Sequence, residues 1–176
     1  MSNNNHDFEM LARRVKMLIL DVDGVMTDGR IILDNDGNEF KSFDVRDGHA
    51  LKLAGRAGLL LAVITGRTSK VVERRMKELG INEVYQGIFN KISVYKDLLK
   101  KYNFSDEEIA YMGDDVVDVP VLEVVGLPAV PSDADAESTS RARFISENRG
   151  GRGAVRDLVE KILRAQGVWE SLIKGK

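Results

Sequence analysis

Hydrophobic positions along the chain fall into short runs, and the stretches between these runs carry apolar residues at helical spacing. The short runs are rich in β-branched residues and have the length of strands. They predict strands at Lys16–Leu20, Leu59–Thr65, Glu83–Gln86, Ile109–Gly113, Leu127–Val130 and Arg143–Ile145. The stretches between them predict helices at Ala50–Ala57, Ser69–Leu79, Ile92–Tyr102, Val117–Val124, Ala134–Ser140 and Ala154–Gln166.

The alternation of strands and helices is typical of a parallel sheet covered by helices. We therefore expect a doubly wound, Rossmann-like α/β fold, with a mostly parallel sheet and helices on both faces. The length of 176 residues suits one domain over 1–176. The segment 29–43 departs from the alternation, because two β-like runs flank Asn35-Asp36-Gly37, which favours a projecting hairpin. The segment 149–176 is a C-terminal tail with a helical or frayed end.

Composition excludes several classes of function. The formal net charge is −2, so the chain has no general basic field for nucleic acid or an anionic membrane. It contains no cysteine, which excludes a disulfide, a thiolate metal site and a thiol nucleophile. No apolar run approaches the ~20 residues that span a bilayer. We expect a cytoplasmic protein without nucleic-acid or membrane partners. His6, in an end expected to be disordered, and His49 lack the spacing of a metal site.

Two carboxylates stand at the end of the first predicted strand, at Asp21 and Asp23, and Gly24 follows them. Side chains two positions apart share one face of a regular strand but stand side by side along it, so they converge on one ligand only if the chain turns there. Glycine permits such a turn because it adopts backbone conformations that other residues rarely reach. This short motif alone is also consistent with a plain strand followed by an acidic turn.

A possible anion site follows the second long strand, at Thr65 and Gly66, just before a predicted helix. Free N–H groups and the helix dipole favour an anion at such a position, although an ordinary N-capped loop has the same pattern. Lys91 opens a later helix, where a cation is mildly unfavourable for the dipole. This placement hints at another purpose, although a surface lysine is the ordinary interpretation.

Three carboxylates crowd together after the strand predicted at Ile109–Gly113, at Asp114, Asp115 and Asp118. Such crowding is costly unless a cation neutralises it. Magnesium prefers hard oxygen ligands and few protein carboxylates, which leaves room for phosphate oxygens. Acidic residues are also favoured at helix N-termini, so capping alone is an alternative explanation.

All of these groups share one position, the carboxyl end of a predicted strand. A parallel sheet brings those ends to one edge, where ligands bind in open α/β folds. Their joint occurrence favours a single site that handles a metal and a phosphate over several unrelated structural features.

The motifs resemble those of the haloacid dehalogenase-like phosphatases, which carry DxDG, then T-G-R, then a lysine, then GDDxxD. The resemblance extends from about Val15 to about Leu163. Longer stretches are similar to a narrower family, the 3-deoxy-D-manno-octulosonate 8-phosphate (KDO 8-phosphate) phosphatases. They are DVDGVMTDG, GNEFKSFDVRDGHALK, ITGR, YQGIFNK, YMGDDVVDVP and GGRGAVRD. A neighbouring family acts on 2-keto-3-deoxynononate 9-phosphate, and the sequence does not separate the two.

The resemblance implies a Mg²⁺-dependent phosphatase that forms an aspartyl-phosphate. Asp21 would be the nucleophile and a magnesium ligand. Asp23 would be the acid/base and would bind magnesium through its backbone carbonyl, and Asp114 would be the third protein ligand. Thr65, Gly66 and Lys91 would hold the phosphoryl oxygens, and Thr65 and Lys91 would also act in catalysis. Asp115 and Asp118 would hold the metal ligands in place without contacting the metal themselves.

Contacts with the sugar acid are implied for the stretch after the hairpin and for several arginines. A guanidinium group suits a carboxylate because its N–H groups form a fork, although any one arginine can also be a surface charge. Lys52 departs from the family pattern, which has arginine there, so we do not carry over a substrate contact to that position. The candidate residues are Asp44, Val45, Arg46, Asp47, Gly48, Arg67, Arg75, Arg149 and Arg152.

The site should lack a cap domain, because the segments between its motifs are too short for the ~50 residues of a small domain. The resemblance implies a homotetramer in which the hairpin, 29–43, helps to cover a neighbouring site. A solvent-exposed flap is the alternative. The family further implies lipopolysaccharide precursor synthesis in a Gram-negative bacterium.

Other classes of protein remain as alternatives. A phospho-aspartate receiver-like signalling domain also uses an aspartate, magnesium, a threonine and a lysine on a doubly wound sheet, but it places its acidic pair and its phosphorylated aspartate differently. A non-catalytic assembly module built on the hairpin is disfavoured by the intact set of Asp21, Asp23, Lys91 and Asp114.

Overall fold

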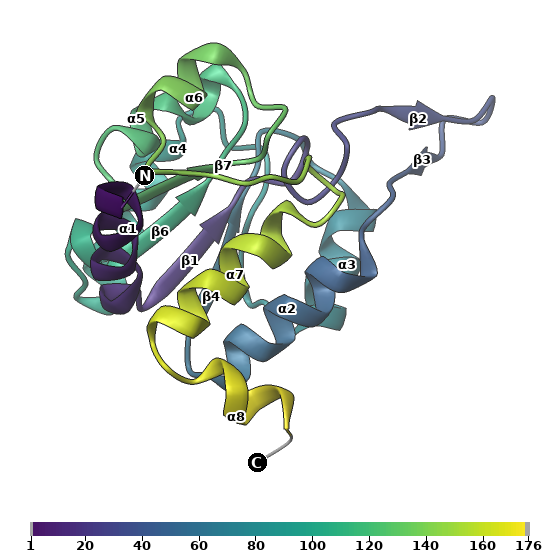
Figure 1. Cartoon of the computed structure of the whole chain (residues 1–176). Coiled ribbons are helices and arrows are strands. Elements are labelled where there is room, and N and C mark those ends of the chain that lie inside the picture. Colours follow the sequence, from purple (N-terminus) through teal and green to yellow (C-terminus); the bar gives the residue numbers. More distant parts are fainter. Residues whose placement is uncertain (1, 175–176) are drawn as a thin grey trace.

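The computed structural model describes residues 2–174, with side chains from Asp7 onward. The side chain of His6 and the last two residues of the predicted tail lie outside this part. A parallel sheet of six strands forms the centre, in the order β5-β4-β1-β6-β7-β8 (Figure 1). Its strands are β1 (Met17–Leu20), β4 (Leu60–Ile64), β5 (Glu83–Tyr85), β6 (Ile109–Met112), β7 (Leu127–Val130) and β8 (Phe144–Ile145).

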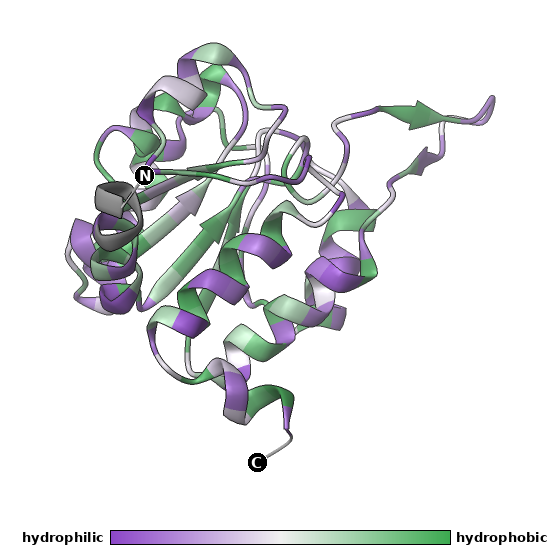
Figure 2. Ribbon diagram, viewed as in Figure 1, coloured by the Kyte–Doolittle hydropathy of each residue, from purple (hydrophilic) through white to green (hydrophobic). Residues whose placement is uncertain are grey.

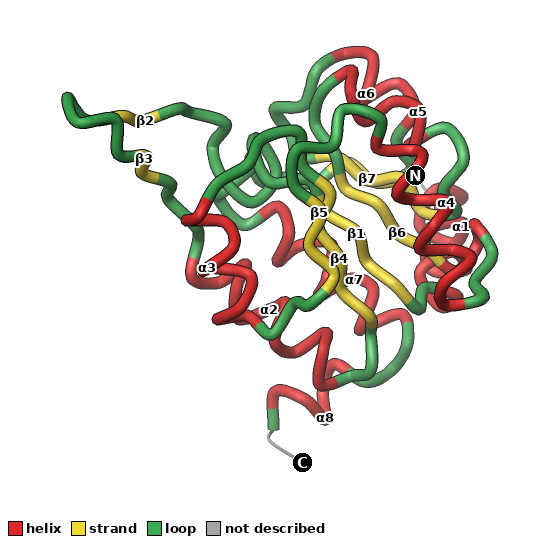
Figure 3. Tube along the Cα trace, turned by 180° about the vertical axis from the view of Figure 1, so that it is seen from behind, coloured by secondary structure: helices red, strands yellow, loops and turns green. Residues whose placement is uncertain are grey.

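Helices cover both faces of this sheet (Figures 1 and 3). One face packs against α1 (Ser2–Arg14), α2 (Val45–Arg56), α3 (Lys70–Leu79) and α7 (Ala154–Ala165), and α8 (Trp169–Ile173) follows α7. The other face packs against α4 (Lys91–Tyr102), α5 (Val119–Leu122) and α6 (Ala136–Arg141).

Strand β1 contributes side chains to a hydrophobic core on each face of the sheet. Leu18 and Leu20 enter one hydrophobic core, while Met17 and Ile19 enter the other. All four side chains are buried, as expected for a central strand whose two faces are both covered. The predicted fold class is therefore confirmed, and the sheet is parallel throughout.

The hairpin projects from the carboxyl edge of the sheet (Figure 1). Its strands are short, β2 (Ile32–Leu33) and β3 (Glu39–Phe40), and they pair antiparallel. Asp34 closes the turn, because its carboxylate accepts hydrogen bonds from the backbone N–H groups of Asp36 and Asn38 at 3.0 and 2.8 Å. Between β1 and β4 the described chain holds only this hairpin and α2, so it carries no cap domain there.

Two elements differ from the sequence prediction. α1 occupies the end that was expected to be disordered, and Phe8 and Ala12 are buried there. α2 begins at Val45, well before the predicted Ala50, because the Asp44 carboxylate caps it. Within residues 2–174, no helix is both long and apolar enough to cross a membrane.

Candidate active site

The chain turns sharply where β1 ends. The Asp21 N–H still donates to the Met112 carbonyl at 3.0 Å, so Asp21 continues the sheet beside β6. Beyond it, the Val22 carbonyl accepts from the N–H groups of Met26 and Thr27 at 2.9 and 3.1 Å. Gly24 has a φ of +95°, and a Cβ there would lie 1.9 Å from Asp114 Oδ2. Glycine is therefore required both by the backbone conformation and by the closeness of Asp114.

Lys91 lies between two carboxylates at this edge. Its Nζ is 2.9 Å from Asp21 Oδ1 and 2.6 Å from Asp118 Oδ1, and its side chain is only 2% exposed. A buried ammonium group needs such partners because it has lost its water. The dipole of α4 does not favour a cation at the start of the helix. The two carboxylates explain why Lys91 is nevertheless placed there.

Asp118 uses its oxygens within the protein. Oδ1 accepts from Lys91 and from the Tyr111 hydroxyl, and Oδ2 accepts from the backbone N–H groups of Asp114 and Asp115 at 3.0 and 3.3 Å. Gly113 makes room for it, since a Cβ there would lie 2.4 Å from Asp118 Cγ. Asp118 therefore fixes both the lysine and the turn after β6.

The donor set fits a hard divalent cation. Oxygen atoms of Asp21, Asp114 and Asp118 lie within 4.8 Å of one another. Asp114 Oδ1 is buried and has no hydrogen-bond partner among the described residues. Because Asp118 is already engaged, Asp21 and Asp114 are the side chains best placed to bind a metal. Asp115 is exposed and caps the following turn, accepting from the Val116 N–H at 2.7 Å.

Protonation states point in the same direction. Burial, with the nearby charges of Asp21 and Asp118, raises the pKa of Asp114 to about 8. Burial also raises the pKa of Asp21 to about 6, against the attraction of Lys91. For Lys91, burial alone would lower the pKa, but its two carboxylate partners raise it above the ordinary value. The acids thus outnumber the cations, and a divalent metal would balance the charge.

The segment Thr65–Ser69 borders the same edge. Thr65 is buried, and its N–H donates to the Tyr85 carbonyl at 2.9 Å. Gly66 faces open space, because the nearest atom to an added Cβ is a carbonyl oxygen 3.9 Å away. Ser69 caps α3, and its own N–H donates to Gln86 Oε1 at 2.7 Å. Thr65 and Gly66 remain predicted phosphate ligands.

The two predicted substrate-binding aspartates make contacts inside the protein. Asp44 caps α2, accepting from the N–H of Arg46 at 2.6 Å. Asp47 is buried and accepts from the N–H groups of Gly153 and Arg156 at 3.2 and 2.7 Å, so it joins α2 to the start of α7. Burial raises the pKa of Asp47. Contact between these aspartates and a substrate stays a prediction.

The remaining substrate candidates on α2 and α3 differ in exposure. Val45 is 78% exposed, and Arg46 is also exposed. Gly48 is buried beneath Arg75, since a Cβ there would lie 2.2 Å from Arg75 Nη2. Arg75 lies over the Phe43 ring at 5.7 Å. Gly48 therefore lets Arg75 cross α2.

The glycine-rich loop 149–153 packs against the turn after β1. The Gly151 N–H donates to the Val25 carbonyl at 2.9 Å, and a Cβ on Gly150 would lie 1.7 Å from the Gly24 carbonyl oxygen. Arg149 and Arg152 are exposed, so the loop presents its charges to solvent and its glycines to the site.

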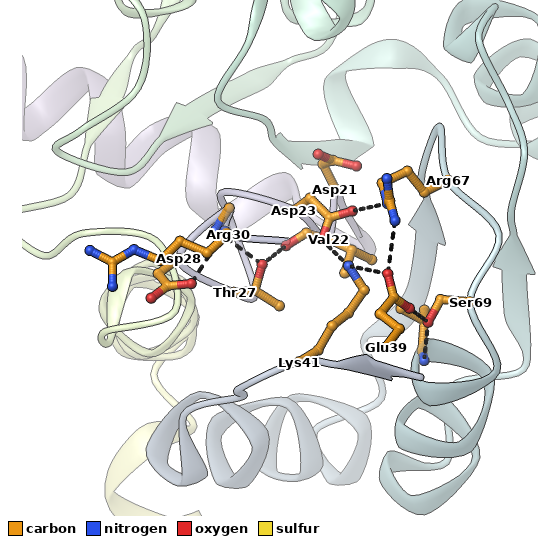
Figure 4. Close-up of polar contacts among 12 residues, drawn as sticks. Asp21, Val22, Asp23, Thr27, Asp28, Arg30, Glu39, Lys41, Arg67 and Ser69 are labelled. Atoms are coloured by element: carbon orange, nitrogen blue, oxygen red, sulfur yellow. Dashed lines mark hydrogen bonds and ion pairs between the residues drawn. The ribbon is translucent and has the colours of Figure 1, made fainter. Parts of the chain in front are cut away.

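Lys41 and Glu39 are site residues that the sequence interpretation did not single out. Both come from the base of the hairpin and reach Asp23 and Arg67, as Figure 4 shows. The sequence carried only a partial signal, because positions 39 and 41 are alternate residues of a predicted β-like run and such residues share one face. That spacing predicts that the two charges lie on one side of the hairpin, but it does not predict that they reach Asp23.

Comparison with known proteins agrees with this geometry. A family model described as haloacid dehalogenase-like hydrolase matches residues 80–156. The 3-deoxy-D-manno-octulosonate 8-phosphate phosphatase KdsC of Escherichia coli (strain K12) is 46% identical over 156 residues, which cover 89% of this chain and 83% of that protein. The chain belongs to this family of haloacid dehalogenase-like phosphatases.

Solved structures of KDO 8-phosphate phosphatases have the same fold. The enzyme from Yersinia pestis superposes with a TM-score of 0.92 at 41% identity, over 93% of this chain and 89% of that one. The enzyme from Moraxella catarrhalis, in complex with a magnesium ion, a phosphate ion and KDO, superposes with a TM-score of 0.94 at 36% identity, over 97% of this chain and 98% of that one. The resemblance to this phosphatase family, inferred from the motifs, is confirmed.

Proposed function

We propose that this chain is a magnesium-dependent phosphatase that hydrolyses 3-deoxy-D-manno-octulosonate 8-phosphate to KDO and phosphate through an aspartyl-phosphate on Asp21. The observation that carries the proposal is the gathering of Asp21, Asp114 and Lys91 at one sheet edge, in a chain 46% identical to phosphatases of that name. The magnesium, phosphate and KDO bound by the Moraxella enzyme support the same ligands here.

The Asp21 and Asp114 carboxylates, together with the Asp23 backbone carbonyl, would hold the magnesium ion. When bound, the ion would supply positive charge that reduces repulsion between a carboxylate and a phosphate dianion. The unpartnered Asp114 Oδ1 and the cluster of acidic side chains support this assignment. Asp118 would act only by holding Lys91 and the backbone of the turn after β6.

The protein's own groups account for both halves of the reaction. A carboxylate oxygen of Asp21 attacks phosphorus, and the bond from phosphorus to the sugar oxygen breaks. Asp23 gives a proton to that leaving oxygen. It then takes a proton from the water that attacks phosphorus of the aspartyl-phosphate, and the bond from phosphorus to the Asp21 oxygen breaks, which releases phosphate and restores the Asp21 carboxylate. Lys91, Thr65 and Gly66 hold the phosphoryl oxygens and stabilise their charge.

A test of this proposal is a panel of sugar-acid phosphates assayed for phosphate release, in magnesium and in chelator. The eight-carbon 8-phosphate should be hydrolysed with the highest kcat/KM, and only with metal. Preference for 2-keto-3-deoxynononate 9-phosphate would reassign the substrate while leaving the chemistry intact. An aspartyl-phosphate that persists for minutes with little turnover would contradict the phosphatase and favour a receiver-like function.

We also propose that the chain assembles as a homotetramer through its hairpin. Figure 2 shows apolar β2 on this projecting segment, and its large apolar side chains are exposed. They are Ile31, Ile32, Leu33 and Phe40, at 57, 47, 59 and 55%. Exposed apolar side chains on a projection favour burial against another surface. A cytoplasmic location stays a prediction.

The assembly can be tested by light scattering coupled to size-exclusion chromatography. The unaltered chain should elute as a tetramer, and Ile32→Asp should shift it to smaller species. A control, Val124→Asp, changes an apolar side chain that is also exposed but lies away from the hairpin. A monomer at all concentrations for the unaltered chain would refute the tetramer.

A further inference from the structure

Lys41, at the base of the hairpin, extends its side chain into the active site. The Lys41 side chain is only 1% exposed, and its Nζ forms an ion pair with Asp23 Oδ1. Its second carboxylate neighbour is Glu39 Oε1, at 3.6 Å. A buried ammonium group is stable only beside such partners. Lys41 is therefore held at Asp23, and it is not a solvated charge of the hairpin surface.

Glu39 links this lysine to the loop after β4. Its Oε1 accepts from Arg67 Nη2 at 2.9 Å, and its Oε2 accepts from the Ser69 hydroxyl. The hydrogen bond from Ser69, with the nearby cations, lowers the pKa of Glu39. Glu39 is thus an anion that anchors the hairpin base to the loop carrying the phosphate-binding candidates.

The ion pairs form a closed ring of four side chains, which are Asp23, Lys41, Glu39 and Arg67 (Figure 4). Arg67 Nε lies 3.7 Å from Asp23 Oδ2, so each carboxylate oxygen of Asp23 faces a different cation. Asp21 is held separately by Lys91, from the opposite face of the sheet. The two aspartates of the strand tip therefore have separate cationic partners, supplied by different elements of the fold.

We propose that Lys41 is a positioning residue for Asp23, and that Glu39 maintains it by holding Lys41 and Arg67 in place. The inference rests on the proposed function, in which Asp23 transfers protons to the leaving oxygen and from water. Asp23 stands on a turn, and its carboxylate needs a fixed direction to reach both oxygens. Misplacement of a reacting group by about 1 Å can cost ~100-fold in rate.

The expected defect differs from that of a lost substrate contact. Lys41→Met keeps the length of the side chain and removes the ammonium group that holds Asp23. We expect kcat to fall about 10- to 100-fold without a rise in KM, whereas loss of a substrate contact would raise KM. Aspartyl-phosphate should accumulate in acid-quenched samples, because Asp23 must take a proton from water to complete hydrolysis. Glu39→Gln should show a smaller defect of the same kind.

A matched control is Lys101→Met, which removes a lysine that also pairs with a carboxylate, Glu83, at 2.6 Å, but far from the site and 53% exposed. Its kinetics should equal those of the unaltered enzyme. Lys41→Ala, with space for a small amine, should regain part of its turnover when ethylammonium is added. Rescue would show that the missing group is the ammonium ion near Asp23, since a defect of folding alone would not respond.

The assays use KDO 8-phosphate and, in parallel, p-nitrophenyl phosphate, because hydrolysis of the aspartyl-phosphate is the same for both. If the unaltered enzyme turns over neither compound, the proposed function fails. If it turns over either one and Lys41→Met does so within twofold of the same rate, only the positioning role is overturned. Loss of turnover without accumulated aspartyl-phosphate and without amine rescue would overturn it as well.

Discussion

Replacement of Gly24 by alanine should damage the site in a way that can be measured against a matched glycine. Gly24 has a φ of +95°, and its added Cβ would lie 1.9 Å from Asp114 Oδ2. Gly58 has nearly the same backbone conformation, with a φ of +90°, but nothing lies within 4 Å of its added Cβ. The two substitutions share the cost of the backbone and differ only in the collision with Asp114.

The magnitudes follow from these two geometries. An alanine in the left-handed region costs about 1–2 kcal/mol, and this should be the whole effect of Gly58→Ala. Gly24→Ala should cost about 1–3 kcal/mol more, because Asp114 must move to relieve the overlap. The displaced Asp114 should also bind magnesium less well. A loss of ~1.4–2.8 kcal/mol in binding free energy corresponds to a 10- to 100-fold lower magnesium affinity.

Urea unfolding in chelator would give the free energy of unfolding of both variants, and calorimetric titration with magnesium would give the affinity. Gly58→Ala should retain the affinity and turnover of the unaltered chain. Equal destabilisation of the two variants, or an affinity of Gly24→Ala within twofold of the unaltered chain, would refute the reasoning that Asp114 needs this glycine to bind the metal.

Three further predictions concern the buried charges. Asp21→Asn should abolish phosphate release while leaving the circular dichroism and melting of the protein intact, and substantial turnover with magnesium would exclude Asp21 as nucleophile. Lys91→Met should abolish turnover and lower the free energy of unfolding by about 3–5 kcal/mol in urea, because it leaves Asp21 and Asp118 without their buried cation; a change below about 1 kcal/mol would contradict the buried pair. In chelator, stability should fall as pH rises from about 4 to about 8, because Asp21 and Asp114 have folded-state pKa values of about 6 and about 8, above the unfolded value of 3.8. The slope should reach about 1.4 kcal/mol per pH unit for each carboxyl, and Asp114→Asn should remove the decline above pH 6 in the same unfolding assay.

The sequence predicted the sheet well because its strands are buried on both faces and read as apolar runs. The convergence of Asp21, Lys91 and Asp114 was also predictable, since parallel strands end at one edge. The role of Gly24 was foreseen only as a turn. Its closeness to Asp114 depends on how two distant segments pack, and no local pattern carries that information.

The parts that were missed depend on tertiary contacts. α1 begins with Ser-Asn-Asn-Asn, residues of low helix propensity. It is supported by packing of its apolar side chains, and the Phe8 ring lies 5.2 Å from the Phe144 ring. Lys41 was missed because nothing local shows that a hairpin lysine folds back to Asp23. The hydrogen bonds of Asp47 to the start of α7 were likewise not foreseen, while its contact with the substrate stays a prediction.

The loop of Gly150 and Gly151 gives the C-terminal part of the chain an influence beyond its own residues. Every side chain proposed for the chemistry precedes position 119, yet the turn that presents Asp23 rests on backbone made more than thirty residues later. During synthesis, the turn would lack this backing until the start of α7 had emerged and joined Asp47. The enzyme should therefore become competent only after α7 has been made, and a fragment ending after α6 should be inert despite containing all the reactive groups.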